Sequence, residues 1–127
     1  MKNKVKLISF GMSLPGPVPK VDVLLDVRWM VQNPYHSLAD KKLTGKDDGV
    51  RKQVVQSPGA EEVLRALDSL LAIPAIRTIG VACMGGRHRS VALIEETATR
   101  YAGPRGLELI HLALPARSGH ALKGDRP

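Results

Sequence analysis

The sequence predicts an α/β fold, a single-domain sandwich with a mainly parallel sheet. Short apolar segments, partly β-branched, alternate along the chain with segments whose apolar residues recur at helical spacing. The 127 residues suffice for one domain, and 43% of them are hydrophobic. We find no repeat and no boundary between domains, and we expect residues 1–114 to form the domain. Residues 115–127 are polar, basic and rich in small residues, which predicts a disordered tail.

The elements are expected in the order strand, strand, helix, helix, strand, helix, strand. The second helix should start at Ser57-Pro58, with a capping hydroxyl followed by a proline in the first turn, and Pro74 should stop it. A long loop covers residues 29–49, and loops of that length in small domains are usually functional or mobile. The predicted strands cover 4–10, 21–27, 78–82 and 107–114, and the predicted helices cover 49–56, 58–71 and 88–101.

Composition restricts the possible partners. The net charge of +7 favours anionic partners, from phosphorylated metabolites to nucleic acid. Only 3% of the residues are aromatic, which argues against a platform that stacks single-stranded bases. The single cysteine allows no internal disulfide, and there is neither a signal peptide nor an apolar run long enough to span a bilayer. We therefore expect a cytoplasmic protein without a membrane partner.

The chain is organised around residues 79–91, which predict a buried strand, a glycine loop and the start of a helix. Gly85 and Gly86 can adopt backbone angles closed to other residues and leave amide groups uncovered. Those amides and the first free N–H groups of the helix favour an anion. The basic residues that follow add positive charge, and an arginine fork can hold two phosphate oxygens. We predict a phosphate or similar anion here; the alternative is a tight turn with solvated basic residues, Arg87, His88 and Arg89.

The same segment fits a second chemistry. Cys83 and Arg89 stand at the Cys-x5-Arg spacing of the cysteine-dependent phosphatases, and Ser90 supplies the hydroxyl that helps the thiol leave. Ala82 replaces the histidine that usually precedes that cysteine, and no aspartate is placed as a general acid. The alternative is that Cys83 is a small buried residue at a strand end.

Other chemically active residues leave alternatives open. His88 is a ligand contact, an acid/base group or a helix cap. Asp26 and Arg28 either pair as a structural clamp or place Asp26 against a ligand hydroxyl or amine. Asp47 either starts a helix or contributes an acid. Because no second histidine or cysteine stands at metal-ligand spacing from His88, we expect no metal, and without a Gly-x4-Gly-Lys-Ser/Thr motif we expect no nucleotide hydrolysis and no cofactor.

Taken together, these residues resemble the C-terminal domain of the RapZ RNase-adapter family. The pattern runs in order through 9–11, 26–28, 33–34, 43–47 and 83–91, and covers most of the chain from Val5 to Tyr101. Full-length members carry an N-terminal P-loop domain, and this chain looks like a stand-alone version of the C-terminal half. Met84 stands where the family commonly has threonine, and His36 is offset from the family's pattern.

The resemblance implies an α/β domain similar to a phosphofructokinase subdomain. It also implies a non-catalytic pocket that senses an amino-sugar phosphate, glucosamine-6-phosphate. RNA, a ribonuclease and further copies of the chain are the partners it implies, although the end of the last strand lacks the family's basic-acidic run. Carried over by motif, the pocket candidates are Asp26, Arg28, Thr44, Gly45, Cys83, Gly85, Gly86, His88, Arg89 and Ser90, and Arg87 joins them by its charge. A charge-driven RNA-binding module that uses the basic tail remains a third hypothesis.

Overall fold

A five-stranded sheet forms the centre of the molecule in the computed structural model, which describes residues 4–32, 43–115 and 120–122. The strands lie in the order β2-β3-β1-β4-β5. β1 pairs in parallel with β3 and β4, β2 pairs in parallel with β3, and β5 pairs antiparallel with β4. The predicted parallel α/β sheet is thus confirmed. The strands are β1 (Val5–Gly11), β2 (Val23–Asp26), β3 (Thr78–Cys83), β4 (Leu107–His111) and β5 (His120–Leu122).

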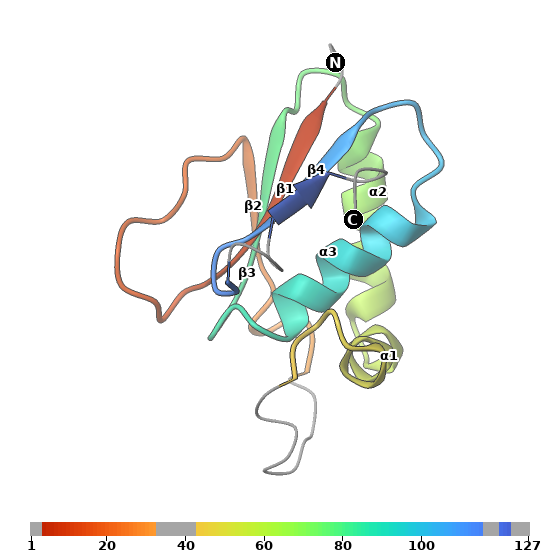
Figure 1. Cartoon of the computed structure of the whole chain (residues 1–127). Helices are drawn as coiled ribbons and strands as arrows, with labels where there is room; N and C mark the ends of the chain where they lie inside the picture. The colour runs from red at the N-terminus through yellow and green to blue at the C-terminus, as the bar shows by residue number, and fades with distance from the viewer. Residues whose placement is uncertain (1–3, 33–42, 116–119, 123–127) are drawn as a thin grey trace.

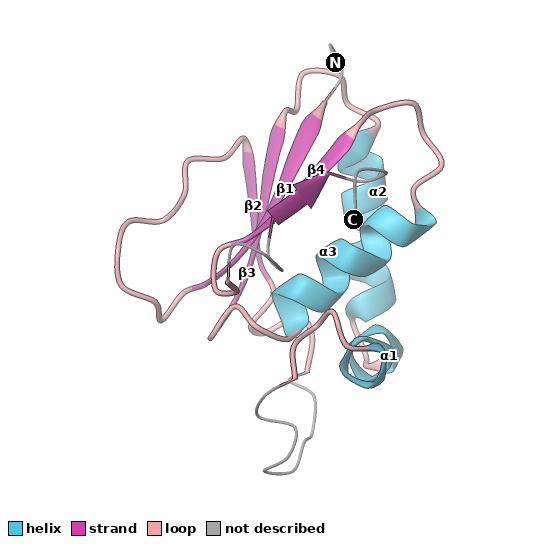
Figure 2. Ribbon diagram, in the orientation of Figure 1, coloured by secondary structure: helices cyan, strands magenta, loops and turns pink. Residues whose placement is uncertain are grey.

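Three helices lie together on one side of this sheet (Figures 1 and 2). They are α1 (Asp48–Gln56), α2 (Ala60–Leu71) and α3 (Arg89–Arg100). The crossover from β2 to β3 contains α1 and α2, and the crossover from β3 to β4 contains α3. Both crossovers advance in the same direction across the sheet, so right-handed connections place their helices on the same face.

The main core lies between this helical layer and the sheet. Alternate residues of the central strands point into it, as the pleat of a strand requires. α2 presents an apolar stripe to it, and α3 is buried along most of its length. The core residues of the strands include Val5, Leu7, Ile79, Val81, Leu107 and Leu109, and those of α2 include Val63, Leu64, Leu67 and Leu71.

The predicted start of the second helix is wrong by a few residues. Ser57 does not cap α2: its hydroxyl donates to the carbonyl oxygen of Val54 at 2.6 Å and closes the end of α1. Gly59 takes the N-cap position of α2 with φ +90°, a left-handed angle that favours glycine. A Cβ there would collide with the Met30 carbonyl oxygen, so this glycine lets the chain after β2 approach α2.

The last strand and the tail also differ from the expectation. β4 ends at His111, three residues before the predicted end, and residues 112–114 form a turn. Within the segment expected to be a disordered tail, His120–Leu122 pairs with Glu108–Ile110 as β5. These three residues are too few to show the period-two pattern that predicts a strand. In the part of the chain that is described, no helix is long and apolar enough to cross a membrane.

Candidate functional site: an anion site at the carboxyl ends of the strands

The predicted site residues gather at one edge of the sheet, where β1, β2 and β3 end. The register pairs Gly11 with Cys83 and Asp26 with Ala82, so the three strands stop at the same level. The loop 84–88 leaves β3 there and leads directly into α3. Ligands of open parallel sheets bind at this edge, because the connecting loops converge there.

The glycine loop folds over the end of β1. Gly86 has φ +77°, and a Cβ on it would lie 2.5 Å from the Gly11 amide nitrogen. The segment after β1 holds the start of the loop, because the Ser13 amide and hydroxyl both donate to the Met84 carbonyl oxygen, at 3.0 and 2.8 Å. The path of the loop is therefore fixed by backbone contacts that only glycine permits.

The two loop amides have different environments. The Gly86 N–H donates to Cys83 Sγ at 3.2 Å, so it faces the protein and not an incoming ligand. Gly85 is exposed, with open space around its Cα, and no described residue accepts from its N–H. Of the two amides predicted to form the anion seat, that of Gly86 has an acceptor within the protein, and that of Gly85 has none among the described residues.

Cys83 is enclosed at the end of β3. It is 2% exposed, and its sulfur lies 3.3 Å from Ser90 Oγ in addition to the Gly86 amide. The short distance to Ser90 bridges the end of β3 and the first turn of α3. A thiol that is covered and held between two polar neighbours fits the structural alternative better than an accessible nucleophile.

Arg89 turns away from the loop. It is 7% exposed, and its Nη1 donates to the carbonyl oxygens of Arg28 at 2.9 Å and Val31 at 3.2 Å. Its Nε is buried with no hydrogen-bond partner in the described structure. The guanidinium therefore ties the segment after β2 to the start of α3. This position does not favour the phosphatase hypothesis, because that mechanism requires the Arg89 guanidinium to hold a phosphate above the Cys83 sulfur.

Asp26 and Arg28 form the clamp that was one of the two alternatives for this pair. Nε and Nη2 of Arg28 donate to the Asp26 carboxylate at distances between 2.7 and 3.1 Å, and the Arg28 amide also donates to it at 3.1 Å. The Arg28 side chain lowers the pKa of Asp26, and the same pairing raises the pKa of Arg28. Trp29 is 83% exposed, and its ring centre lies 5.7 Å from the Arg28 guanidinium.

The Thr44-Gly45 segment docks on the start of α3. The Gly45 amide donates to the Arg87 carbonyl oxygen at 2.7 Å, and His88 Nε2 lies 2.9 Å from the Leu43 carbonyl oxygen. A Cβ on Gly45 would lie 2.5 Å from the His88 carbonyl oxygen. Two segments more than forty residues apart thus meet at the candidate site, as the family resemblance implied.

Asp47 links the Thr44-Gly45 segment to the start of α1. It occupies the N-cap position of α1, and its carboxylate accepts the Thr44 amide at 2.7 Å without capping the helix. This is the expected alternative in which Asp47 starts a helix. The segments 33–34 and His36 of the family pattern lie outside the described residues, as do Arg117, Lys123 and Arg126 of the tail.

The electrostatics of the α3 N-terminus favour an anion. Its first turn contains no acidic residue, and no side chain caps it. The basic residues 87–89 instead stand at the positive end of the helix dipole, where cations are unfavourable and anions are stabilised. The first N–H groups of a helix have no acceptor within the helix. A bound anion would satisfy these groups and offset the local positive charge.

Sequence reasoning missed a buried polar chain behind this site. Ser9 Oγ lies 2.6 Å from His111 Nδ1, and His111 Nε2 lies 2.8 Å from the Glu95 carboxylate. All three side chains are buried, and they join β1, β4 and α3. The sequence alone assigned no role to His111. Its period-two position in the last strand, facing the core like Leu107 and Leu109, was the available signal.

The fold and this edge define the class of protein: a small α/β domain with a positively charged loop and helix N-terminus at the carboxyl ends of its parallel strands. The RapZ C-terminal domain family matches residues 3–114, which is most of the chain. The chain therefore belongs to the RapZ C-terminal domain family.

Several relatives are similar over the same region. A protein named "Nucleotide-binding protein" from Rubrobacter xylanophilus is 42% identical over 110 residues, covering 80% of this chain and 35% of the relative. The "Nucleotide-binding protein TTHA0319" of Thermus thermophilus is 37% identical over 116 residues, covering 84% of this chain and 41% of the relative. A "Nucleotide-binding protein" of Geobacter metallireducens is 39% identical over 101 residues. The chain thus spans well under half of the length of these relatives.

Proposed function

We propose that this domain binds a phosphorylated small molecule, and specifically an amino-sugar phosphate such as glucosamine-6-phosphate, at the loop between β3 and α3. The observation that carries the proposal is the N-terminus of α3, which has basic residues at positions 87–89, no acidic residue in its first turn and no side-chain cap. This arrangement is unfavourable for an isolated helix and becomes favourable when an anion is bound. The family membership supports the same site.

The proposal assigns different tasks to the gathered residues. The Gly85 amide and the first turn of α3 hold the phosphate, and Arg87 and His88 add charge around it. Arg89 positions the segment after β2 through its bonds to Arg28 and Val31. Asp26, on the neighbouring strand end, keeps its pairing with Arg28, and the acceptor capacity left on its carboxylate takes a hydrogen bond from the amine or a hydroxyl of the sugar. This carboxylate stays ionised at neutral pH, since its pairing with Arg28 lowers its pKa.

The domain binds its ligand without transforming it. Cys83 is enclosed and Arg89 is directed elsewhere, so the two groups that a cysteine phosphatase needs do not converge. The names of the relatives suggest nucleotides as a second class of phosphorylated ligand. Because this chain spans only 35% to 41% of the relatives named above, their nucleotide site need not lie in the shared region.

Calorimetric titration with a matched panel tests the proposal. The panel contains glucosamine-6-phosphate, glucose-6-phosphate, glucosamine, inorganic phosphate and AMP. We expect glucosamine-6-phosphate to bind best, and glucosamine to bind at least about tenfold more weakly because it lacks the charge-assisted hydrogen bonds of the phosphate. Equal affinity for glucosamine, or no heat with any phosphorylated compound on a folded sample, would reject the proposal. Preference for AMP would reject its amino-sugar part.

Two arginine variants sharpen this test. Arg87→Gln removes a charge next to the α3 N-terminus and should weaken phosphate-dependent binding by about tenfold. Arg65→Gln is the matched control, because Arg65 is an exposed residue of α2 whose ion pair in the described part of the chain is with Glu62. An equal effect of the two variants would indicate a general charge effect and not a site.

A coupling to RNA is the regulatory part of the proposal. The net charge of +7 gives the domain a long-range attraction for polyanions, and the family resemblance points to small RNAs. RNA affinity measured with and without glucosamine-6-phosphate tests this coupling, at several salt concentrations since such binding weakens with salt. Absence of RNA binding at low salt would remove this part and leave the ligand site intact.

A further inference from the structure

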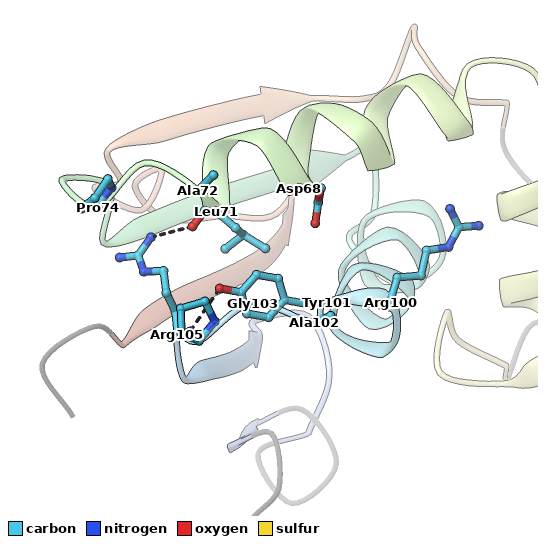
Figure 3. A pocket seen from close by; sticks show the side chains of 10 residues that line it. Asp68, Leu71, Ala72, Pro74, Arg100, Tyr101, Ala102, Gly103 and Arg105 are labelled. Atoms are coloured by element: carbon cyan, nitrogen blue, oxygen red, sulfur yellow. Dashed lines mark hydrogen bonds between the residues drawn. The ribbon is translucent and has the colours of Figure 1, made fainter.

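A cavity lies at the edge of the sheet where the strands begin, opposite the candidate anion site. It has a volume of about 570 Å³ and opens between the C-terminal half of α2 and the loop that joins α3 to β4 (Figure 3). A volume of this size suits a small organic ligand. Apolar groups line much of it, namely Leu71, Ala72, Pro74, Ala102 and Pro104.

The two arginines that border the cavity are already engaged. Arg100 points away from it in Figure 3, and its Nε and Nη1 donate to Glu96 at 2.8 Å and Glu61 at 2.7 Å. Arg105 Nη1 donates to the carbonyl oxygens of Leu71 at 3.3 Å and Ile73 at 3.2 Å, where α2 ends. Neither guanidinium is presented to a ligand as an open fork.

Asp68 is the charged group that the cavity does present. Its side chain projects from α2 toward the Tyr101 side of the cavity (Figure 3), and none of the described residues donates a hydrogen bond to it or pairs with it. It stands near the C-terminus of α2, whose last turn contains no basic residue. Both the carboxylate and the negative end of the helix dipole favour a cation at this position.

Tyr101 provides a fixed aromatic wall. Its hydroxyl accepts the Arg105 amide at 3.1 Å. Its ring packs against the loop so closely that a Cβ on Gly103 would lie 2.5 Å from the Tyr101 Cζ atom. An aromatic ring held in place beside a carboxylate is suited to an ammonium group, which is attracted to both.

A buried hydroxyl lies next to the cavity. Thr97 is 4% exposed, and its Oγ1 has no hydrogen-bond partner in the described structure. It lines a smaller cavity of about 220 Å³ that shares Asp68 and Arg100 with the larger one. A buried hydroxyl without a partner is costly, and this one belongs to the smaller cavity, so it is not part of the ligand site proposed below.

We propose that this cavity binds a small organic cation, an ammonium compound with a compact apolar body. The ammonium group pairs with Asp68 and lies at the Tyr101 ring, and the apolar body rests on Leu71 and Pro104. The site is separate from the proposed phosphate site, which lies at the opposite edge of the sheet. This site binds a cation and the phosphate site binds an anion, so the two sites are tested with different probes.

Amide-resolved NMR titration of the full chain with phenethylammonium tests the proposal. We expect saturable shifts at Asp68, Ala102 and Gly103, and at least about tenfold weaker binding of the matched 2-phenylethanol and phenylacetate. Asp68→Asn should weaken the phenethylammonium affinity by about tenfold or more, which a purely apolar cavity would not show. No shifts up to about 20 mM probe, or equal binding of the alcohol, would overturn the proposal.

Matched variants separate the contribution of the Asp68 carboxylate from that of the Tyr101 ring. Glu62→Gln on the solvent side of α2 is the control for Asp68→Asn, because Glu62 is exposed, and should leave the affinity unchanged within about twofold. Tyr101→Phe keeps the ring and should bind the probe, whereas Tyr101→Leu should bind it about fivefold to tenfold more weakly. Equal affinities for the Asp68→Asn and Glu62→Gln variants, or for the two Tyr101 variants, would contradict the assignment.

Discussion

Gly11 and Gly86 meet backbone to backbone, with the position of a Cβ on Gly86 only 2.5 Å from the Gly11 amide nitrogen. This contact seats the loop of the candidate site on the end of β1. Because Gly86 also has φ +77°, Gly86→Ala brings both a collision and backbone strain. We expect it to lower the free energy of unfolding by about 1–3 kcal/mol or more, measured by urea denaturation.

The neighbouring glycine is the matched control for that prediction. Gly85 has open space around its Cα and no positive φ, so Gly85→Ala should change stability by less than about 0.5 kcal/mol. Equal losses in the two variants would mean that the loop does not sit on Gly11 as described.

Gly45 should matter for both stability and ligand binding. A Cβ on it would approach the His88 carbonyl oxygen to 2.5 Å and push the Thr44-Gly45 segment off α3. We expect Gly45→Ala to lower the free energy of unfolding by about 1–3 kcal/mol and to weaken phosphate-dependent binding. Gly49→Ala serves as the control, since nothing lies near that position within α1 and alanine should stabilise the helix by up to about 1 kcal/mol.

The buried chain Ser9–His111–Glu95 should be a main contributor to stability. His111→Ala removes the imidazole from between two buried polar groups and leaves the Glu95 carboxylate without its 2.8 Å partner. Breaking a buried pair of this kind typically costs about 3–5 kcal/mol, and urea denaturation would measure the loss. Glu95→Gln keeps a group that can accept from the ring and should cost less. A loss below about 1 kcal/mol for His111→Ala would show that the chain is not coupled to folding.

Stability should decrease in acid through three carboxylates with lowered pKa values. The backbone amides of Arg77 and Thr78 lower the pKa of Asp22, the Arg28 side chain that of Asp26, and the Arg100 side chain that of Glu61. The unfolded chain, with aspartate near 3.8 and glutamate near 4.5, binds more protons in this range than the folded chain. The stabilisation is thus present above about pH 4.5 and lost as pH falls through the folded values.

Thermal unfolding between about pH 6 and pH 2.5 measures this effect. Asp26→Asn should flatten the acid limb of the curve of midpoint against pH, because the lowered pKa of Asp26 contributes to that limb. An unchanged acid limb in Asp26→Asn would contradict the assigned role of the Arg28 pairing.

Much of the fold could be predicted because the local patterns agree with the tertiary structure. The apolar stripe of α2, the short buried β3 and the helix after the glycine loop each have one plausible structure. The start of α2 was missed because Ser57-Pro58 is also a good end for a preceding helix, and only the approach of Met30 to Gly59 decides between the two. β5 was missed because its three residues are specified by the free edge of β4 and not by their own pattern.

The residues of the candidate site lie close together in the structure, but the directions of their amides and side chains could not be predicted. The resemblance to the RapZ C-terminal domain family implied that Thr44-Gly45 belongs with residues 83–90, and a hydrogen bond from the Gly45 amide to the Arg87 carbonyl oxygen joins the two segments. Spacing gives no information on where an amide or a guanidinium points. The Gly86 amide donates inward to Cys83 Sγ, and the Arg89 guanidinium donates to the carbonyl oxygens of Arg28 and Val31. The direction of Arg89 thus depends on a segment about sixty residues away in sequence, which local spacing does not reveal.

The central claim is that an anion binds at the start of α3, and amide-resolved NMR titration with glucosamine-6-phosphate tests it most directly. We predict that the largest saturable shifts fall on the amides of Gly85, Arg89 and Ser90, and that glucosamine without its phosphate does not produce them. Absence of shifts at those amides, or shifts confined to the cavity around Asp68 and Tyr101, would contradict the claim.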